Sequence, residues 1–479
     1  MKWDVVIGLE VHVQLNTKTK AFCACSTQYG AEPNTQVCPV CLGYPGALPV
    51  LNEELVRSAV AAGIATHSKI RTKSQFSRKN YFYPDLPKGY QISQYDDPIC
   101  YDGYVEIENE GKKKKIGLIR IHMEEDSGKS LHSESGTLID LNRSGVPLLE
   151  IVSQPEIHSP QEAYAYLTTL KQRLRYTGIS NCNMEEGSLR CDANISLKPA
   201  GSPAFGTRTE LKNLNSFRNV ERALTFEINR QKELLESGGT ITQATLLWDE
   251  QKQETRQMRG KEESHDYRYF PEPDLPPVLI TEDFIQNLRM QLPEMPDLRK
   301  ERFIDKYDML EDDAAVLTNE KEIADYFENL VKLFPNNVKL ARHWVQGEIL
   351  RILKEQNLSA GQIPIKASHL AELLQFVDRQ DITPQTGKAV LDEMCATGKS
   401  AAIIIDEKAL MKIADSGELS TIIDKIIQNS PKESARYRSG KIQLLAYFIG
   451  QVMKATKGQA DQGITRKLLI EKLGPVTEG

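Results

Sequence analysis

The residues best suited to chemistry occur at every second position of a short segment near the start of the chain. In residues 5–15, Gly8, Glu10, His12 and Gln14 alternate with a row of apolar side chains. A period of two is typical of a β-strand with one apolar and one polar face. Carboxylates beside basic groups suit Mg²⁺ bound together with phosphate, because oxygen atoms hold the ion while Arg or Lys neutralises the anion.

The same alternation recurs in three later segments, each with a carboxylate in its polar row. The polar rows are Arg120, His122 and Glu124, then Arg190, Asp192, Asn194 and Ser196, then Arg208, Glu210 and Lys212. Opposite the first of these rows, the predicted apolar side chains are Ile119, Ile121 and Met123. If all four segments join one sheet, one face forms the core and the other carries charges. A plain antiparallel sheet with a solvated face has the same pattern, so both interpretations stay open.

Four of the eight cysteines form two close pairs, Cys23 with Cys25 and Cys38 with Cys41. In a chain without an export signal, this spacing predicts a four-thiolate zinc site rather than disulfides. We expect the zinc to be structural, since four protein ligands leave no open position for a reactant. Reduced thiols without a metal are the alternative.

Composition sets outer limits on the kind of protein. At 479 residues the chain predicts two to four domains, and its net charge of −6 gives no overall nucleic-acid signature. Residues 410–479 hold eleven Lys or Arg against seven Asp or Glu, a local charge of +4 that suits either a polyanion contact or an ordinary helical surface. No apolar run resembles a signal peptide or a membrane span, so we expect a cytoplasmic protein without a membrane partner.

Two stretches rich in tyrosine, proline and basic residues are predicted to be loops near a site. They span residues 77–97 and 267–276, and both contain a run of aromatic side chains followed by Pro-Asp-Leu-Pro or Pro-Glu-Pro-Asp-Leu-Pro. Loops of this kind often carry function, although turns braced by aromatic rings are an alternative. The chain has no complete P-loop, because Gly128-Lys129-Ser130 and Gly398-Lys399-Ser400 lack the upstream glycine.

The predicted fold class is α+β, in three parts. Residues 1–293 are expected to form a mostly antiparallel sheet domain with some helices, including one from Ser216 to Glu236 that begins at a serine cap. Residues 294–409 have the apolar spacing of helices, and residues 410–479 are predicted to form a small helical tail domain.

Several long motifs resemble one family, the B subunits of the aspartyl/glutamyl-tRNA amidotransferases. The motifs are residues 7–12, 78–91, 140–150, 184–194, 267–275, 450–454 and 458–461. They cover essentially the whole chain in order. The resemblance implies a cradle-like catalytic domain in residues 1–293 with the zinc knuckle, and a tail domain that binds tRNA.

The resemblance also implies the reaction. Such subunits use ATP to phosphorylate the side-chain carboxylate of Glu-tRNA(Gln) or Asp-tRNA(Asn), and ammonia then displaces phosphate to give the amide. Carried onto this chain, the implied Mg²⁺ shell is Glu10, His12, Glu124, Glu125, Asp192 and Glu210. The residues expected to neutralise ATP phosphates are Arg78, Lys79, Lys88 and Arg190. Strand alternation would separate Glu124 from Glu125 unless the strand ends there.

The implied enzyme is a ligase that forms a C–N bond with glutamine as amido donor. The family's glutaminase is a separate polypeptide, the A subunit, and the heterotrimer is braced by a small C subunit. This chain alone should therefore make no amide from glutamine. Two other functions fit parts of the pattern: a non-catalytic tRNA-binding scaffold, and an ATP-dependent carboxylate–amine ligase for a small molecule.

Overall fold

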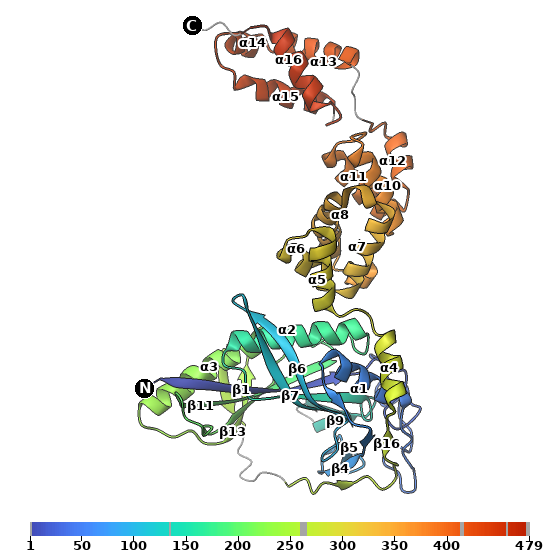
Figure 1. Cartoon of the computed structure of the whole chain (residues 1–479), viewed down its shortest axis with the longest axis vertical. Helices are drawn as coiled ribbons and strands as arrows, with labels where there is room; N and C mark the ends of the chain where they lie inside the picture. The colour runs from blue at the N-terminus through green and yellow to red at the C-terminus, as the bar shows by residue number, and fades with distance from the viewer. Residues whose placement is uncertain (1, 134–135, 259–265, 412–415, 457, 476–479) are drawn as a thin grey trace. The chain divides into compact units, whose positions relative to one another are not determined.

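A computed structural model describes residues 2–133, 136–258, 266–411, 416–456 and 458–475 of the chain (Figure 1). The chain forms two compact units, Met1–Leu298 and Arg299–Gly479. The first unit combines a large sheet with helices and the second is helical, which confirms the predicted α+β class.

One nine-stranded sheet organises the first unit, in the order β14-β13-β12-β11-β1-β10-β7-β6-β2. Its strands are β1 (Trp3–Gln14), β2 (Lys69–Ile70), β6 (Cys100–Asn109), β7 (Lys112–Glu125), β10 (Pro147–Ser153), β11 (Leu189–Pro199), β12 (Thr209–Lys212), β13 (Ala244–Asp249) and β14 (Glu254–Gln257). All neighbours pair antiparallel except β12 and β13, which are parallel. The four segments predicted from their alternation lie in β1, β7, β11 and β12 of this one sheet, with β10 between β1 and β7.

The apolar face of the sheet packs against helices (Figure 1). These helices are α1 (Glu53–Ala65), α2 (Pro160–Thr177) and α3 (Phe217–Glu236), while α4 (Glu282–Gln291) packs against α1. Ile7, Leu9 and Val11 of β1 are buried in the same apolar cluster as Leu170 of α2 and Leu224 of α3. Since side chains alternate along a strand, this packing leaves Glu10 and His12 on the opposite face.

The predicted serine cap of α3 is confirmed. The helix begins at Phe217, and the Ser216 side chain accepts a hydrogen bond of 3.1 Å from the backbone N–H of Asn219. This bond satisfies one of the N–H groups that a helix start leaves unpaired.

A β-bulge in β7 corrects one detail of the predicted alternation. Leu118 pairs with Ser153, but the next pair joins Arg120 to Val152, so Ile119 is an extra residue without a partner in the register. Ile119 is therefore 39% exposed, whereas Leu118 is only 2% exposed. The prediction that Ile119 lies on the apolar face is wrong, because strict alternation does not hold across a bulge.

Three small sheets complete the described part of the first unit. The two tyrosine-rich stretches lie side by side in one of them, since β4 (Ser77–Asn80) pairs with both β5 (Tyr90–Ser93) and β15 (Phe270–Pro271). The others pair β3 (Lys73–Ser74) with β16 (Val278–Leu279), and β8 (Lys129–Ser133) with β9 (Gly136–Asp140).

The described part of the second unit is built from helices around two separate apolar cores, one within residues 303–405 and one within residues 419–473. Around the first are α5 (Pro296–Tyr307), α6 (Glu311–Thr318), α7 (Lys321–Leu333), α8 (Val338–Trp344), α9 (Leu350–Glu355), α10 (Ala367–Asp378), α11 (Pro384–Thr397) and α12 (Ala401–Glu407). Around the second are α13 (Ser416–Asn429), α14 (Pro431–Arg438), α15 (Leu444–Ala455) and α16 (Gln462–Leu473). Within the described ranges, no helix is both long and apolar enough to cross a membrane.

Candidate active site and cysteine knuckle

The centre of the polar face holds a compact group of one imidazole and two carboxylates. Strand register places His12 of β1 opposite Glu150 of β10, and Glu150 opposite His122 of β7. His12 Nε2 lies 3.3 Å from a Glu150 oxygen and 3.6 Å from a Glu124 oxygen. One ligand atom from each of His12, Glu124 and Glu150 fits within 4.8 Å of the others, which is an arrangement that could hold a metal ion. We call these three residues the acid triad.

His122 and Arg120 border the acid triad on β7. His122 Nε2 lies 3.5 Å from Glu150 and 3.7 Å from Glu124, while Arg120 donates a 3.3 Å hydrogen bond from Nε to His122 Nδ1. Because this bond occupies Nδ1 as an acceptor, it favours the tautomer with the proton on Nε2, which faces the carboxylates.

The acid triad has strongly coupled electrostatics. Burial alone would raise the pKa of Glu150, but His122 and His12 outweigh it and hold the pKa of this carboxyl well below its usual range. Burial would likewise lower the pKa of His12, and the carboxylates of Glu150 and Glu124 raise it instead. The described side chains thus keep the Glu150 carboxylate ionised, as a metal ligand must be.

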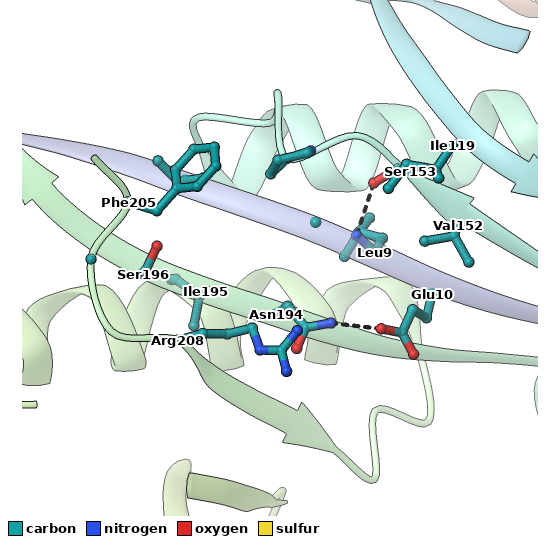
Figure 2. A pocket seen from close by; sticks show the side chains of 14 residues that line it. Leu9, Glu10, Ile119, Val152, Ser153, Asn194, Ile195, Ser196, Phe205 and Arg208 are labelled. Atoms are coloured by element: carbon teal, nitrogen blue, oxygen red, sulfur yellow. Dashed lines mark hydrogen bonds between the residues drawn. The ribbon is translucent and has the colours of Figure 1, made fainter. Parts of the chain in front are cut away.

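A second acidic group continues along β1, β11 and β12. Glu10 lies opposite Asp192 in the strand register and accepts a 2.9 Å hydrogen bond from the Asn194 amide (Figure 2). Lys212 Nζ lies 2.8 Å from Asp192 and 3.0 Å from Glu210. Burial, followed by the nearby Glu150 and Glu210 carboxylates, raises the pKa of Glu10. The structure therefore brings five of the six implied shell residues to the same sheet face, in two adjoining groups.

Glu125 is the sixth, and it does not join them. It is the last residue of β7, and its carboxylate forms an ion pair with Lys88 and accepts a 2.9 Å bond from the backbone N–H of Ile92. The strand continues its alternation to its end, so Glu125 faces away from Glu124. Glu125 and Lys88 form a buried pair, with side chains 3% and 7% exposed.

The other predicted phosphate-binding residues differ in their surroundings. Arg190 lies opposite His12 in the register and pairs with Asp126 at 2.8 Å. Lys79 is close enough to lower the pKa of Glu150. Arg78, in contrast, is held by Glu272 and Asp274 at 2.7 and 2.9 Å.

Sequence reasoning missed Glu150 and Asp126. Glu150 lies in a strand that reads as an almost continuous apolar run, Pro147 to Val152, because both faces of β10 are largely buried. A single carboxylate inside such a run is the one local signal that could have revealed it, since an acid is rarely buried without a partner.

The four cysteines of the predicted zinc site do converge. The Sγ atoms of Cys23, Cys25, Cys38 and Cys41 all lie within 4.8 Å of one another, and those of Cys38 and Cys41 are 3.9 Å apart. Tetrahedral Zn²⁺ with bonds of about 2.3 Å requires sulfur atoms about 3.8 Å apart, so this cluster could bind such a metal. The Cys23 thiol donates to Cys41, which lowers the pKa of Cys41 to about 4.

Comparison with known proteins gives the class of the first unit. A family model described as "GatB/GatE catalytic domain" matches residues 5–286, and one described as "GatB domain" matches residues 325–473. The polar sheet face therefore lies in a catalytic domain of the GatB/GatE type, and most of the helical unit is a GatB domain.

Curated relatives identify the family in full. Proteins named as the B subunit of aspartyl/glutamyl-tRNA(Asn/Gln) amidotransferase, from Caldanaerobacter subterraneus subsp. tengcongensis and Geobacter sp. (strain M21), are 53% and 51% identical to this chain. One from Thermoanaerobacter pseudethanolicus is 52% identical. Each match covers 99% of this chain and 100% of the relative. The chain belongs to the family of aspartyl/glutamyl-tRNA(Asn/Gln) amidotransferase B subunits.

Proposed function

We propose that this chain is the part of a tRNA-dependent amidotransferase that activates the carboxylate of Glu-tRNA(Gln), Asp-tRNA(Asn) or both. ATP transfers its γ-phosphoryl group to the side-chain carboxylate, which gives an acyl phosphate and ADP. Ammonia then attacks the acyl carbon, phosphate leaves, and the side chain becomes an amide. The observation that carries this proposal is the acid triad with its flanking cations, on the polar face of a domain whose relatives bear this name.

The donor set of the acid triad fits the ion that phosphoryl transfer needs. The two carboxylates of the triad suit Mg²⁺ or Mn²⁺, and Glu10, Asp192 and Glu210 place further carboxylates on the same sheet face. When bound, such an ion neutralises the negative charge of the phosphates and orients them. Arg190, Lys79 and Lys212 add fixed positive charge around the acids, although Arg190 and Lys212 already pair with carboxylates.

The protein's own task in this reaction is positioning. A carboxylate is a poor acyl donor, and phosphorylation supplies a better leaving group. Two anions, the substrate carboxylate and the ATP phosphates, must meet in line, so neutralisation and alignment account for most of the catalysis. The hydrogen bonds that fix His122, Glu10 and Arg190 restrict these side chains before substrate arrives.

Aromatic side chains beside the acid triad support an RNA substrate. Tyr81 and Tyr267 have ring centroids 6.1 Å apart, and Lys79 Nζ lies 4.9 Å from the Tyr267 ring. Burial and the carboxylate of Glu124 raise the pKa of Tyr81, which places the ring within the field of the triad. Unpaired bases stack on aromatic rings of this kind, so Tyr81 and Tyr267 are suited to bind the single-stranded end of an aminoacylated tRNA beside the acid triad. The basic tail domain supports a second contact with the tRNA body.

Ammonia must come from another polypeptide. Membership of a family of B subunits supports assembly with partners, which we propose to be a glutaminase, the A subunit, and a small third polypeptide, the C subunit. The four-cysteine cluster is proposed to bind a structural Zn²⁺, because all four ligand positions are filled by thiols.

The test is ATP turnover by the reconstituted heterotrimer with Glu-tRNA(Gln), with uncharged tRNA(Gln) and with free glutamate. Of the three substrates, the proposal predicts ADP formation only with the charged tRNA. It also predicts that the Glu10→Ala variant loses this ADP formation. ADP formation with free glutamate would instead identify a small-molecule ligase. Amide formation without any ADP would indicate a scaffold whose acids do no chemistry.

A further inference from the structure

Lys20, which lies three positions before Cys23, is 0% exposed. No other lysine in the described ranges is enclosed to this degree. A lysine is almost never fully buried without an anionic partner, because the ammonium group loses its bonds to water. The surroundings of Lys20 must therefore contain a group that can carry negative charge.

The Lys20 ammonium group contacts a sulfur atom and a carbonyl oxygen. Its Nζ lies 3.6 Å from Cys41 Sγ and 3.3 Å from the backbone oxygen of Leu141. Among the side chains that the structure describes, no carboxylate forms an ion pair with it. A Glu125 oxygen lies nearby, beside Gly145, but that carboxylate already has its own lysine partner. The Cys41 sulfur is therefore the group that can supply the missing anion.

Lys20 connects the two cysteine pairs of the knuckle. Its backbone N–H donates to the Cys25 oxygen at 2.9 Å, while its side chain reaches Cys41 of the second pair. Cys41 Sγ also accepts a 3.2 Å hydrogen bond from the backbone N–H of Cys38. Cys41 is buried, whereas the other three cysteines of the knuckle are only half-buried. Of the four sulfur atoms, Cys41 Sγ thus belongs to the most enclosed cysteine and receives two N–H donors.

Bound zinc would turn the Cys41 sulfur into the anion that Lys20 lacks. Zinc holds its cysteine ligands as thiolates, and four thiolates outweigh the charge of one Zn²⁺, so the filled knuckle is an anion. An ammonium group beside it neutralises part of this charge and bonds to one ligand sulfur. Protein groups that hold a metal's ligands in this way contribute about 10–100-fold to metal affinity.

We propose that Lys20 is a positioning residue of the zinc knuckle, which orients Cys41 and neutralises part of the charge of the four thiolates. The inference rests on the proposed zinc site and not on the proposed reaction. The coupling is reciprocal, so Lys20 tightens zinc binding and zinc compensates the buried charge of Lys20. Loss of zinc leaves the ammonium group beside the Leu141 carbonyl, in the segment that leads into β10 and its Glu150. A role in packing alone, through the hydrocarbon stem, predicts no such coupling.

The first measurement is the zinc affinity of the reconstituted heterotrimer, from competition with a chelator and atomic emission of the retained zinc. Lys20→Met keeps an unbranched side chain but removes the charge, so it should weaken zinc binding by about 10–100-fold. Lys18→Met is the matched control, since Lys18 is exposed in the same segment, and it should bind zinc as wild type does. A zinc affinity of folded Lys20→Met within about twofold of wild type would overturn the proposal. A wild-type heterotrimer that binds no zinc would overturn the zinc site together with this inference and leave the proposed reaction standing.

The second measurement is the Tm of each protein with zinc and after its removal by a chelator. Zinc removal should lower the Tm of wild type more than that of Lys20→Met, because only wild type is left with a buried ammonium group that lacks its anion. In the cobalt-substituted heterotrimer, the sulfur-to-metal charge-transfer band of Lys20→Met should move to lower energy, since Cys41 loses a hydrogen-bond donor. Equal losses of Tm and an unmoved band would overturn the proposal. Lys20→Gln replaces Lys20→Met if methionine prevents assembly, and the same results are expected because glutamine also removes the charge.

Discussion

Replacing Arg78 with lysine tests whether this side chain braces two loops or binds a phosphate. The Arg78 guanidinium donates to Glu272 at 2.7 and 2.9 Å and to Asp274 at 2.9 Å, and it lies 4.1 Å from the centre of the Tyr90 ring. The Glu272 side chain is 0% exposed, and the hydrogen bond from Arg78 leads the interactions that raise the arginine's own pKa. Arg78 therefore fastens β4 to the segment after β15.

The cost of each substitution follows from these contacts. Arg78→Ala leaves Glu272 buried without its partner, which costs about 3–5 kcal/mol. Lysine keeps the charge but cannot form the paired contact, and the loss of one or two charge-assisted bonds costs about 2–4 kcal/mol. At about 2.1 cal/mol/K per residue, unfolding of the unit Met1–Leu298 has an entropy of about 0.6 kcal/mol/K, so each kcal/mol lowers the Tm by about 1.6 °C and Arg78→Lys should lower it by roughly 3–6 °C.

The assay combines a thermal unfolding curve with the KM for ATP, measured well below the lowered Tm. We expect Arg78→Lys to lose stability and to keep its KM for ATP within about twofold. Glu272→Gln should lose stability too, and the double variant should lose less than the sum of the two, because the side chains interact directly. A normal Tm together with a KM for ATP raised tenfold or more would refute this reasoning and would show that Arg78 contributes to ATP binding.

Three further outcomes follow from other parts of the chain. Cys41→Ser should reduce the bound zinc, measured by atomic emission, to well below one ion per chain, whereas Cys395→Ser should leave it unchanged. Burial would raise the pKa of Glu328, but Arg302 and Arg299 lower it to about 2, so this carboxylate stabilises the fold above its unfolded pKa of 4.5 and loses this effect as pH falls toward 2. Glu328→Gln should therefore lower the urea midpoint at pH 7. Between pH 4.5 and pH 2.5, the urea midpoint of this variant should fall less than that of wild type, and an equal fall would exclude this role. Ser216→Ala should cost about 1 kcal/mol in urea unfolding, and Ser216→Asn should cost less, because asparagine also caps a helix.

Local patterns in the sequence predict much of the sheet face correctly. The alternation in β1, β11 and β12 follows from burial of one face, which forces polar and apolar residues onto opposite sides. This is enough to place Glu10, Asp192 and Glu210 each on the polar face of its own strand, whereas their shared surface follows only once these strands join one sheet. The cysteine spacing is equally local, since two close pairs need only one turn to converge.

The remaining features depend on contacts between distant residues. Glu150 joins the acid triad because β10 inserts between β1 and β7, and no local pattern specifies strand order. The Arg78–Glu272 contact spans 194 positions, so an arginine in a basic-aromatic loop looks like a phosphate ligand until its partner is seen. The bulge at Ile119 is a mismatch between two strands, and a single strand's sequence does not show it.

The measurement that tests the central claim most directly is charged-tRNA-dependent ATP hydrolysis by the heterotrimer carrying Glu150→Gln. Glutamine keeps the size of the side chain but removes the charge that would hold the ion. Loss of groups that only orient metal ligands costs about 10–100-fold, so we predict a fall of about 100-fold or more, together with weaker Mn²⁺ binding by electron paramagnetic resonance. Glu106→Gln, on β6 of the same sheet, should keep its rate within about twofold. Full hydrolysis and unchanged Mn²⁺ binding in folded Glu150→Gln would contradict the account, because the acid triad would then be only part of a solvated sheet face.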